Sequence, residues 1–425
     1  MAEGMTARWD VAVVGGGPAG IAAAASAAGT GRRVVLVDEA SRPGGQIWRH
    51  LEGDAPAAAR PWLERLRTSG AAVRTGTTVV DAAAGDNGYR LTVEDQRGSG
   101  ARIDAAAVVL ASGARERFLP FPGWTLPGVT GVGGAQALLK SGVEMQGRRV
   151  VIAGSGPLLL PVAAGLARAG AQVLLVAEQA PRRAVLGFAA GLWREPAKLA
   201  QAAGYRLATR SARYATDAWV IAALGGESLE AVEVVVGGRR RTIACDLLCT
   251  GFGLVPNLGL ARLLGCETEH GAVKVDRQQA TSVERVWCAG EGTGVAGVEA
   301  SLVEGEIAGL AAAGFPGRTD RLMPARDRGA AFARRLERAF TPRQEVRALA
   351  TGSTVVCRCE DVRRNALSGE WSARQAKLYT RIGMGPCQGR VCGPAAEVLF
   401  GWNLESDRMP ISVASIDTLA DAGDD

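Results

Sequence analysis

The sequence predicts an α/β protein with two nucleotide-binding strand–helix–strand units, followed by a small domain built around four cysteines. Three observations carry this prediction. A glycine-rich turn follows an apolar strand near the N-terminus, the same pattern recurs at 149–178, and two close cysteine pairs lie near the C-terminus. A chain of 425 residues is long enough for two or three domains of ordinary size.

The first unit spans residues 10–38 and is complete in all its parts. An apolar strand, "DVAVV", runs into "GGGPAG", an alanine-rich helix and a second strand, "RRVVLVDE". The glycines allow a tight turn, a close approach of the pyrophosphate and close helix–strand packing, and the helix N-terminus offers N–H groups to the phosphates. We therefore predict a Rossmann-like dinucleotide site rather than a purely structural turn. Its candidate residues are Gly15, Gly17, Pro18, Ala19, Gly20, Asp38 and Glu39, with Asp38 as the expected acceptor for the ribose hydroxyls and Glu39 next to it.

Three later segments are expected near the same ligand. "RPGGQIWRH" brings Gly45 close to the ligand and places Gln46 at a flavin edge, although a plain surface loop is the alternative. "VVLASGA" and "VWCAGEGTGVAG" are strands that end in small residues, where backbone passes close to a nucleotide. The second is followed by a helix whose N-terminus favours negative charge on a flavin. The residues predicted here are Gly45, Gln46, Ser112, Gly113, Gly290 and Glu291, the last for ribityl hydroxyls.

The second unit, "RVVIAGSGPLLLPVAAGLARAGAQVLLVAEQ", repeats the first with changes. Gly154 and Gly156 correspond to Gly15 and Gly17, and Glu178 ends the second strand. Leu159 stands where the third glycine belongs, so it would hold the helix away from the strand and crowd a pyrophosphate. Two interpretations stay open: a site for NAD or an adenine nucleotide on Gly154, Gly156 and Glu178, or a retained scaffold.

Four cysteines near the C-terminus predict a metal site. Cys357 and Cys359 lie in "VVCRCED", and Cys387 and Cys392 in "GMGPCQGRVC". A [2Fe–2S] cluster is favoured because the Cys-x-Cys pair is tighter than zinc sites use, and because glycine N–H groups are free to bond cluster sulfurs. Nearby cations also offset the cluster's negative charge. A structural zinc and a disulfide are the alternatives. The residues involved are the glycines 383, 385, 389 and 393 and the cations Arg358, Lys377, Arg381 and Arg390.

The other four cysteines, Cys245, Cys249, Cys266 and Cys288, lie in or beside apolar strands without ligand spacing, so we expect buried hydrophobic residues. His50 and the chain's other histidine are expected to be structural.

These patterns predict four parts of the chain. A discontinuous FAD-binding domain is expected at 8–140 and 271–315, and a second, NAD-type domain at 141–270. Residues 316–350 form a linker whose amphipathic helix, at 325–340, packs on its own chain or, alternatively, on a partner subunit. Residues 351–425 form a small helical [2Fe–2S] domain and tail.

Composition narrows the class of function. The net charge of +6 is spread along the chain, which argues against nucleic-acid binding. No signal peptide precedes the first strand and no apolar run reaches the ~20 residues of a membrane span. We expect a cytoplasmic protein, with peripheral association with the inner membrane left open.

The chain resembles the large, iron–sulfur-containing subunit of bacterial flavin-dependent amino-acid and opine dehydrogenase complexes. This group includes the A subunits of octopine and nopaline oxidase, the alpha subunit of hydroxyproline dehydrogenase, and the corresponding hydrogen cyanide synthase subunit. The motifs that carry the resemblance are "VVGGGPAG", "RPGGQIWR", "LASGARERFLPFPGWTLPGV", "LLCTGFGLVPN", "CAGEGTGVAG" and "VCRCED…TRIGMGPCQGRVCG". The last domain is similar to bacterioferritin-associated ferredoxin, whose cluster ligands correspond to Cys357, Cys359, Cys387 and Cys392.

The resemblance implies a disulfide-reductase-like flavoprotein architecture and a protein that works in a complex. It implies FAD and a [2Fe–2S] cluster in this chain, a D-amino-acid-dehydrogenase-like FAD subunit that oxidises a C–N bond, a small ferredoxin-like subunit, and a quinone or dye acceptor. The substrate class is an amino acid, a proline-type imino acid or an opine. No Cys-x-x-Cys accompanies the second unit, so disulfide reduction is not expected. The alternatives are a self-contained NAD(P)H-dependent reductase that feeds the cluster, and a non-enzymatic scaffold.

Overall fold

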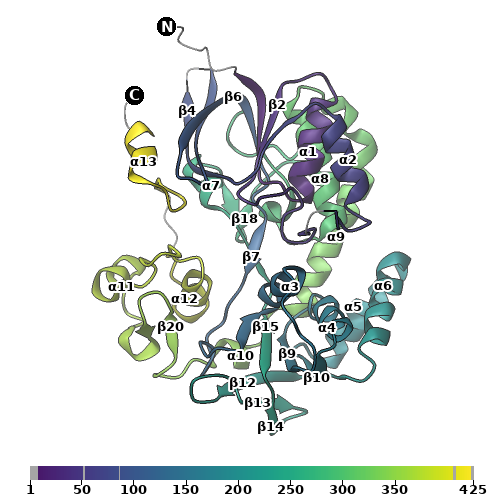
Figure 1. Ribbon diagram of the computed structural model, residues 1–425, viewed down its shortest axis with the longest axis vertical. Coiled ribbons are helices and arrows are strands. Elements are labelled where there is room, and N and C mark those ends of the chain that lie inside the picture. The colour runs from purple at the N-terminus through teal and green to yellow at the C-terminus, as the bar shows by residue number, and fades with distance from the viewer. Residues whose placement is uncertain (1–7, 51–52, 86, 405–407, 423–425) are drawn as a thin grey trace. The chain divides into compact units, whose positions relative to one another are not determined.

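The structure is a computed structural model that describes residues 8–50, 53–85, 87–404 and 408–422. The chain forms two compact units (Figure 1). Unit 1 comprises residues 1–115, 255–333 and 406–425, and unit 2 comprises residues 116–254 and 334–405. Residues 1–7, on which the expected lack of a signal peptide rests, lie outside the described residues. No helix in the described ranges is long and apolar enough to cross a bilayer.

Unit 1 is built on one mixed sheet in the order β3-β2-β1-β6-β5-β4, with β19 beside β6. Strands β1, β2, β3, β6 and β19 run parallel, and β4 and β5 are antiparallel neighbours. The apolar runs of β1 and β2 are almost wholly buried, as parallel strands covered on both faces require. The strands are β1 Trp9–Val14, β2 Val34–Val37, β3 Ala72–Arg74, β4 Thr77–Gly85, β5 Gly88–Asp95, β6 Gly100–Leu110 and β19 Val286–Cys288.

Helices α1 (Pro18–Ala28) and α8 (Val298–Ala312) lie side by side against this sheet (Figure 1). Their contact is close because glycines of α8 face the backbone of α1: a Cβ at Gly305 or Gly309 would overlap the carbonyl oxygen of Ala19 or Ala23. The alanine-rich first helix is therefore a packing surface. Further elements of this unit are the helices α2 Arg60–Thr68 and α7 Gly259–Leu263, the 3-10 turns η2 Gly290–Thr293, η3 Pro316–Arg318 and η4 Asp320–Leu322, and the hairpin β17 Thr268–Glu269 and β18 Ala272–Val273.

The C-terminal tail belongs to unit 1, whereas the sequence analysis grouped it with the cysteine domain. The backbone N–H of Ile411 bonds the Val80 carbonyl, and the backbone N–H and hydroxyl of Ser415 both donate to Glu94 at 2.7 Å. Helix α13 (Ile416–Ala422) follows. The tail lies in unit 1 because it forms long-range hydrogen bonds to strands β4 and β5. Such bonds cannot be predicted from the composition of the tail.

Unit 2 contains a parallel sheet in the order β11-β10-β9-β15-β8. Because β8 pairs with β15, the second unit begins before residue 141, and its second boundary falls at 254/255 rather than 270/271. The strands are β8 Val129–Gly131, β9 Arg149–Gly154, β10 Gln172–Glu178, β11 Arg213–Ala215 and β15 Leu247–Gly251; short strands β7 Ala114–Glu116 and β16 Leu254–Pro256 lie where the chain passes between units.

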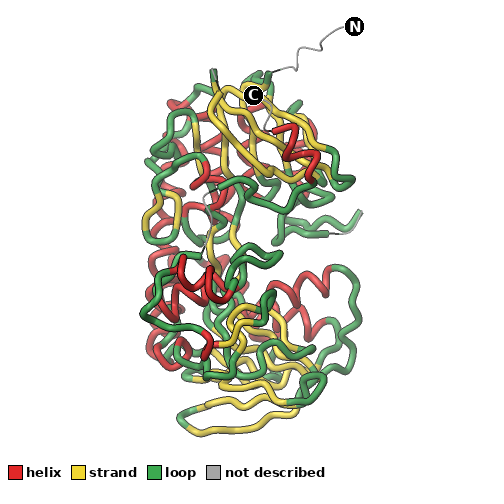
Figure 2. The backbone as a smooth tube through the Cα atoms, turned by 90° about the vertical axis from the view of Figure 1, so that its left-hand side faces the viewer, coloured by secondary structure: helices red, strands yellow, loops and turns green. Residues whose placement is uncertain are grey.

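An antiparallel sheet and five helical segments complete this part of unit 2. The antiparallel strands are visible in yellow at the foot of Figure 2. They are β12 Ala218–Leu224, β13 Ala231–Val236 and β14 Arg239–Ala244, and the helices are α3 Val132–Lys140, α4 Leu159–Arg168, α5 Arg182–Gly191, η1 Leu192–Arg194 and α6 Pro196–Ala208.

The amphipathic helix expected at 325–340 is present as α9 (Met323–Phe340), with Phe332 buried on its own chain. After α10 (Gln344–Arg347), the cysteine domain has its own core, which includes Val356, Ile382 and Trp402. This domain is less helical than expected: only Ala373–Thr380 (α11) is α-helical between the cysteine pairs, started by a capping box of Ser372 and Gln375. Its other elements are β20 Val355–Cys357, β21 Val362–Arg363, η5 Arg364–Ala366 and α12 Cys392–Phe400.

Candidate functional site

The first glycine turn connects β1 directly to α1. Gly17 is the N-cap, and Pro18 is the first residue of the helix, a position that does not need its missing N–H. Gly15 has a φ of 106°, and a Cβ there would overlap the Ala111 carbonyl oxygen. Helix α1 thus starts immediately at the turn, and its N-terminus supplies the partial positive charge that a pyrophosphate needs.

Gly20 explains why the third glycine is required in this turn. A Cβ at this helical position would overlap the carbonyl oxygen of Gly15 and approach Ala111. The helix therefore lies against the strand end without any intervening side chain, as the sequence predicted.

The two acids at the end of β2 have different environments. Asp38 is buried, and its carboxylate accepts hydrogen bonds from the backbone N–H groups of Gly16 and Ala40. Burial raises its pKa, against the effect of these hydrogen bonds. Glu39 is exposed. Asp38 thus fixes the turn, and Glu39 is the acid whose carboxylate is open to solvent.

The "RPGG" loop packs against the glycine turn. The N–H of Gly44 donates to the Gly16 carbonyl at 2.7 Å, and a Cβ at Gly45 would lie 2.9 Å from the Cα of Gly17. Gln46, beside it, is exposed. The structure thus places Gly45 beside the glycine turn. His50 bonds the Trp48 carbonyl through Nδ1 at 2.7 Å, which fits the structural role expected of it.

Asn257 is a residue that the sequence analysis missed. Its side-chain amide donates to the Ser112 carbonyl, its own carbonyl accepts from the Ser112 hydroxyl, and its N–H donates to the Gly113 carbonyl, all at 2.9 Å. These three hydrogen bonds fix the segment after β6, which contains the predicted residues Ser112 and Gly113. The signal in the sequence is the asparagine that closes "LLCTGFGLVPN".

Glu304 is the second missed residue. On α8, it accepts hydrogen bonds from the N–H of Gly290 and the hydroxyl of Thr293, both at 2.9 Å. It is buried, and burial raises its pKa to about 7. It therefore holds the turn that presents Gly290 and Glu291, and burial raises the pKa of Glu291 as well. The available signal was a pair of glutamates, Glu304 and Glu306, in the middle of a largely apolar helix.

The second glycine turn differs in construction. α4 begins at Leu159, two residues beyond the proline that corresponds to Pro18, and Leu159 is fully buried in an apolar cluster. Glu178 accepts from the N–H groups of Gly156 and Ala180 at 2.7 and 2.8 Å, and burial raises its pKa to about 7. The three residues predicted for a second nucleotide thus lie together, but the acid is already bonded to the backbone.

The C-terminal cysteines lie in two interacting pairs, Cys357 with Cys392 and Cys359 with Cys387. The Cys392 thiol lowers the pKa of Cys357, and backbone N–H groups, among them that of Gly383, add to this effect. Cys357 and Cys392 are buried, whereas Cys359 is exposed.

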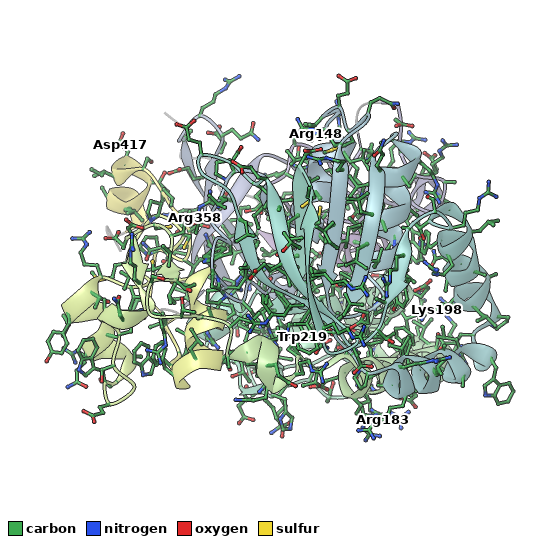
Figure 3. All side chains as sticks on the ribbon, turned by 90° about the horizontal axis from the view of Figure 1, so that it is seen from below. Arg148, Arg183, Lys198, Trp219, Arg358 and Asp417 are labelled. Atoms are coloured by element: carbon green, nitrogen blue, oxygen red, sulfur yellow. The ribbon has the colours of Figure 1, made fainter. Side chains whose placement is uncertain are left out.

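These thiols and N–H groups fit the donor set of an iron–sulfur cluster. Within the described ranges, however, no group of three or more His, Cys, Asp or Glu is arranged as a metal site, so the cluster stays a prediction. Of the cations expected to offset its charge, Arg381 instead pairs with Glu360 at 2.7 Å. Arg358, between the first two cysteines, is labelled in Figure 3.

The remaining cysteines are buried hydrophobic residues, as expected. Burial raises the pKa of Cys245 to about 11, and it raises the pKa values of Cys249, Cys266 and Cys288 as well. Such thiols are poor nucleophiles. They offer no support for disulfide chemistry.

The family model described as pyridine nucleotide-disulphide oxidoreductase matches residues 9–313. The A subunit of opine oxidase from Agrobacterium tumefaciens (strain Ach5) is 34% identical over 427 residues, which covers 90% of this chain and 84% of the relative. Hydrogen cyanide synthase subunit HcnB of Pseudomonas aeruginosa is 33% identical over 427 residues, which covers 89% of this chain and 90% of the relative.

Two solved structures are similar in fold. The L-proline dehydrogenase from P. horikoshii has a TM-score of 0.68 at 19% identity and covers 97% of this chain and 79% of its own. The T. acidophilum thioredoxin reductase has a TM-score of 0.58 at 20% identity, with coverage of 72% and 98%. These likenesses confirm the expected disulfide-reductase-like α/β fold.

Proposed function

The chain belongs to the pyridine nucleotide-disulphide oxidoreductase family, alongside the A subunit of opine oxidase, and from that premise we propose that it is an electron-transfer subunit of a heteromeric dehydrogenase. The complex oxidises the C–N bond of an amino acid, a proline-type imino acid or an opine, and its acceptor is a quinone or dye. The observation that carries this proposal is the similarity to the opine oxidase protein over 90% of the chain.

Two cofactors are proposed: FAD in unit 1 and a [2Fe–2S] cluster in unit 2. When bound, FAD accepts electrons in pairs and the cluster passes them singly. The residues of unit 1 fit FAD because Gly15, Gly17 and Gly20 leave room for a pyrophosphate at the start of α1. Glu39 is proposed to bind the ribose, and Glu291 the ribityl hydroxyls.

Cys357, Cys359, Cys387 and Cys392 are proposed to hold the cluster. The backbone N–H groups of Cys359, Glu360 and Gly383 lower the pKa of Cys357 and so favour its thiolate form. Thiolates are the form that binds iron. The exposed Cys359 marks the side of the cluster from which a partner is proposed to exchange electrons.

The substrate is proposed to bind elsewhere in the complex. A D-amino-acid-dehydrogenase-like FAD subunit would oxidise it, and a small ferredoxin-like subunit would be a further component. Both the opine oxidase relative and the hydrogen cyanide synthase relative are named as subunits, which supports a complex of this kind.

The test is an anaerobic titration of the purified chain, first with NADH and then with dithionite. We expect NADH to leave the flavin absorbance unchanged, and dithionite to bleach the flavin and produce the EPR signal of a reduced [2Fe–2S] cluster. Rapid bleaching by NADH would instead make the chain a self-contained NAD(P)H-dependent reductase. A preparation without flavin, iron or sulfide that still binds its partners would favour a scaffold.

A further inference from the structure

The second glycine turn is in contact with the linker that leads to the cysteine domain. The hydroxyl of Ser155, the middle residue of "GSG", donates to the Phe340 carbonyl at 2.5 Å. A Cβ built on Gly156 would lie 3.8 Å from the side chain of Phe340. The Phe340 ring is held in turn by an edge-to-face contact with Phe188, at 5.0 Å between centroids. An aromatic residue thus lies over the turn that would receive a pyrophosphate.

Gln179 binds the next part of the linker. It follows Glu178, so it occupies the position that Glu39 has in unit 1, but it is only 1% exposed. Its side-chain amide donates to Ser155 Oγ at 2.8 Å and to the Thr341 carbonyl at 3.3 Å, and its Oε1 accepts from the N–H of Arg343 at 2.9 Å. Where unit 1 offers an exposed acid, unit 2 has a buried amide that is already bonded to the chain.

Arg343 completes the attachment. Its guanidinium lies 4.4 Å from the ring centre of Trp219, which is labelled in Figure 3, and its Nη1 is 3.6 Å from Asp217. A cation over an indole face is favourable in itself, and the carboxylate adds attraction. Beyond it, Val346 is buried with Leu119 and Phe252.

The first N–H groups of α4 are hydrogen-bonded within the turn itself. The N–H groups of Leu159 and Leu160 donate to the carbonyls of Gly156 and Pro157, each at 3.2 Å. The N–H of Ile21 in α1 makes the same kind of bond, to the Gly17 carbonyl at 2.9 Å, so these bonds do not distinguish the two turns. The backbone bonds of Glu178 also do not show whether the second turn can bind a nucleotide, because Asp38 makes equivalent bonds in unit 1.

We infer that the second Rossmann-like fold is a socket for the chain's own linker, residues 340–346, and not a nucleotide site. The linker takes the places of pyrophosphate and ribose and fixes the start of the cysteine domain. Further along, the Trp124 indole N–H donates to the Val355 carbonyl at 2.7 Å, two residues before Cys357, and continues this attachment. The inference depends on neither the substrate nor the cluster.

Hydrogen exchange of the full-length, FAD-loaded protein tests the inference, with NADH, NAD⁺ and ADP at millimolar concentration as probes. We expect the peptides that cover 154–160 and 339–347 to exchange at the same rate with and without each nucleotide. Protection of 154–160 together with faster exchange of 339–347 would overturn the inference, because it would show a nucleotide displacing the linker.

Gln179→Ala provides a second test, with Gln172→Ala, at the exposed first position of the strand that ends just before Gln179, as its matched control. Loss of the amide should raise exchange at the Arg343 N–H about tenfold, the usual effect of one net hydrogen bond, while the control stays at the wild-type rate. Ser155→Ala replaces Gln179→Ala if the latter does not fold. Unchanged exchange in the folded variant would overturn the inference.

Flavin bleaching by NADH with unchanged hydrogen exchange in 339–347 would overturn the proposed function but not the inference that the linker occupies the second turn.

Discussion

The two glycine turns of this chain share a pattern and differ in what their surroundings leave open. In unit 1, α1 begins at Pro18, the third glycine lets it lie against the strand, and the acid after Asp38 is exposed. In unit 2, α4 begins later at Leu159, and the residue after Glu178 is a buried glutamine bonded to the linker. The comparison teaches that a glycine pattern specifies a strand–turn–helix path, whereas neighbouring residues determine whether a nucleotide can use it.

Gly20→Leu transfers the residue of the second turn into the first and should have the largest effect. The side chain has no room beside the Gly15 carbonyl, so unit 1 should lose FAD and about 3 kcal/mol or more of unfolding free energy. Flavin absorbance and a denaturation curve measure both. Leu159→Ala is the reciprocal control: it should retain FAD, cost roughly 2–5 kcal/mol in unit 2, and gain no affinity for NADH. A Gly20→Leu protein that keeps its FAD would contradict this interpretation of the turn.

Cys387→Ser tests whether the cofactors of the two units are independent. It should abolish the proposed cluster's absorbance and leave FAD bound, because every predicted FAD residue lies in unit 1 and every cluster cysteine in unit 2. Iron content and the visible spectrum provide the measurement. Cys266→Ser, in unit 1 and beside the Thr281 hydroxyl, is the matched control and should retain both. Joint loss of iron and flavin in Cys387→Ser would show that the units are coupled.

Glu304 bonds the Gly290 turn of unit 1 and Glu178 bonds the second glycine turn of unit 2, and burial raises the pKa of each carboxyl group from 4.5 to about 7. Between these pH values the folded state binds more protons than the unfolded state, so unfolding free energy should fall as pH rises. Each group contributes up to ~1.4 kcal/mol per pH unit. Urea unfolding across this range measures the slope.

The isosteric variants Glu304→Gln and Glu178→Gln should each make that slope shallower. If Glu304→Gln also alters the retention of FAD and Glu178→Gln does not, the difference between the two units extends to cofactor binding. Slopes equal to that of the wild type would mean that both carboxylates titrate normally.

Glu39→Gln should have the smallest effect. A neutral amide is a weaker acceptor for ribose hydroxyls than a carboxylate, so FAD affinity should fall about tenfold. Equilibrium dialysis of the reconstituted apoprotein measures it. Glu64→Gln, an exposed change in the same unit, should leave the affinity as it is. If Glu39→Gln also has no effect, the ribose would be bound by another group, and Asp38 would be the next to change.

The sequence by itself determined the local backbone structure, that is, which segments form strands, turns and helices. The glycine spacing and apolar runs predicted both strand–turn–helix units, because a tight turn and a buried parallel strand impose strict local requirements on residue type. The four cysteines and the amphipathic helix were visible for the same reason. The identity of Leu159 already indicated that the second turn was altered.

Only the tertiary structure decided the roles that depend on distant neighbours. Asn257 reaches Ser112, Glu304 holds Gly290, the tail bonds Glu94, and Gln179 binds Arg343. These partners lie 14 to 321 residues apart, and residues so far apart in sequence share no periodicity or spacing from which the contact can be predicted. Whether a glycine turn receives a nucleotide or the chain's own linker depends on such contacts.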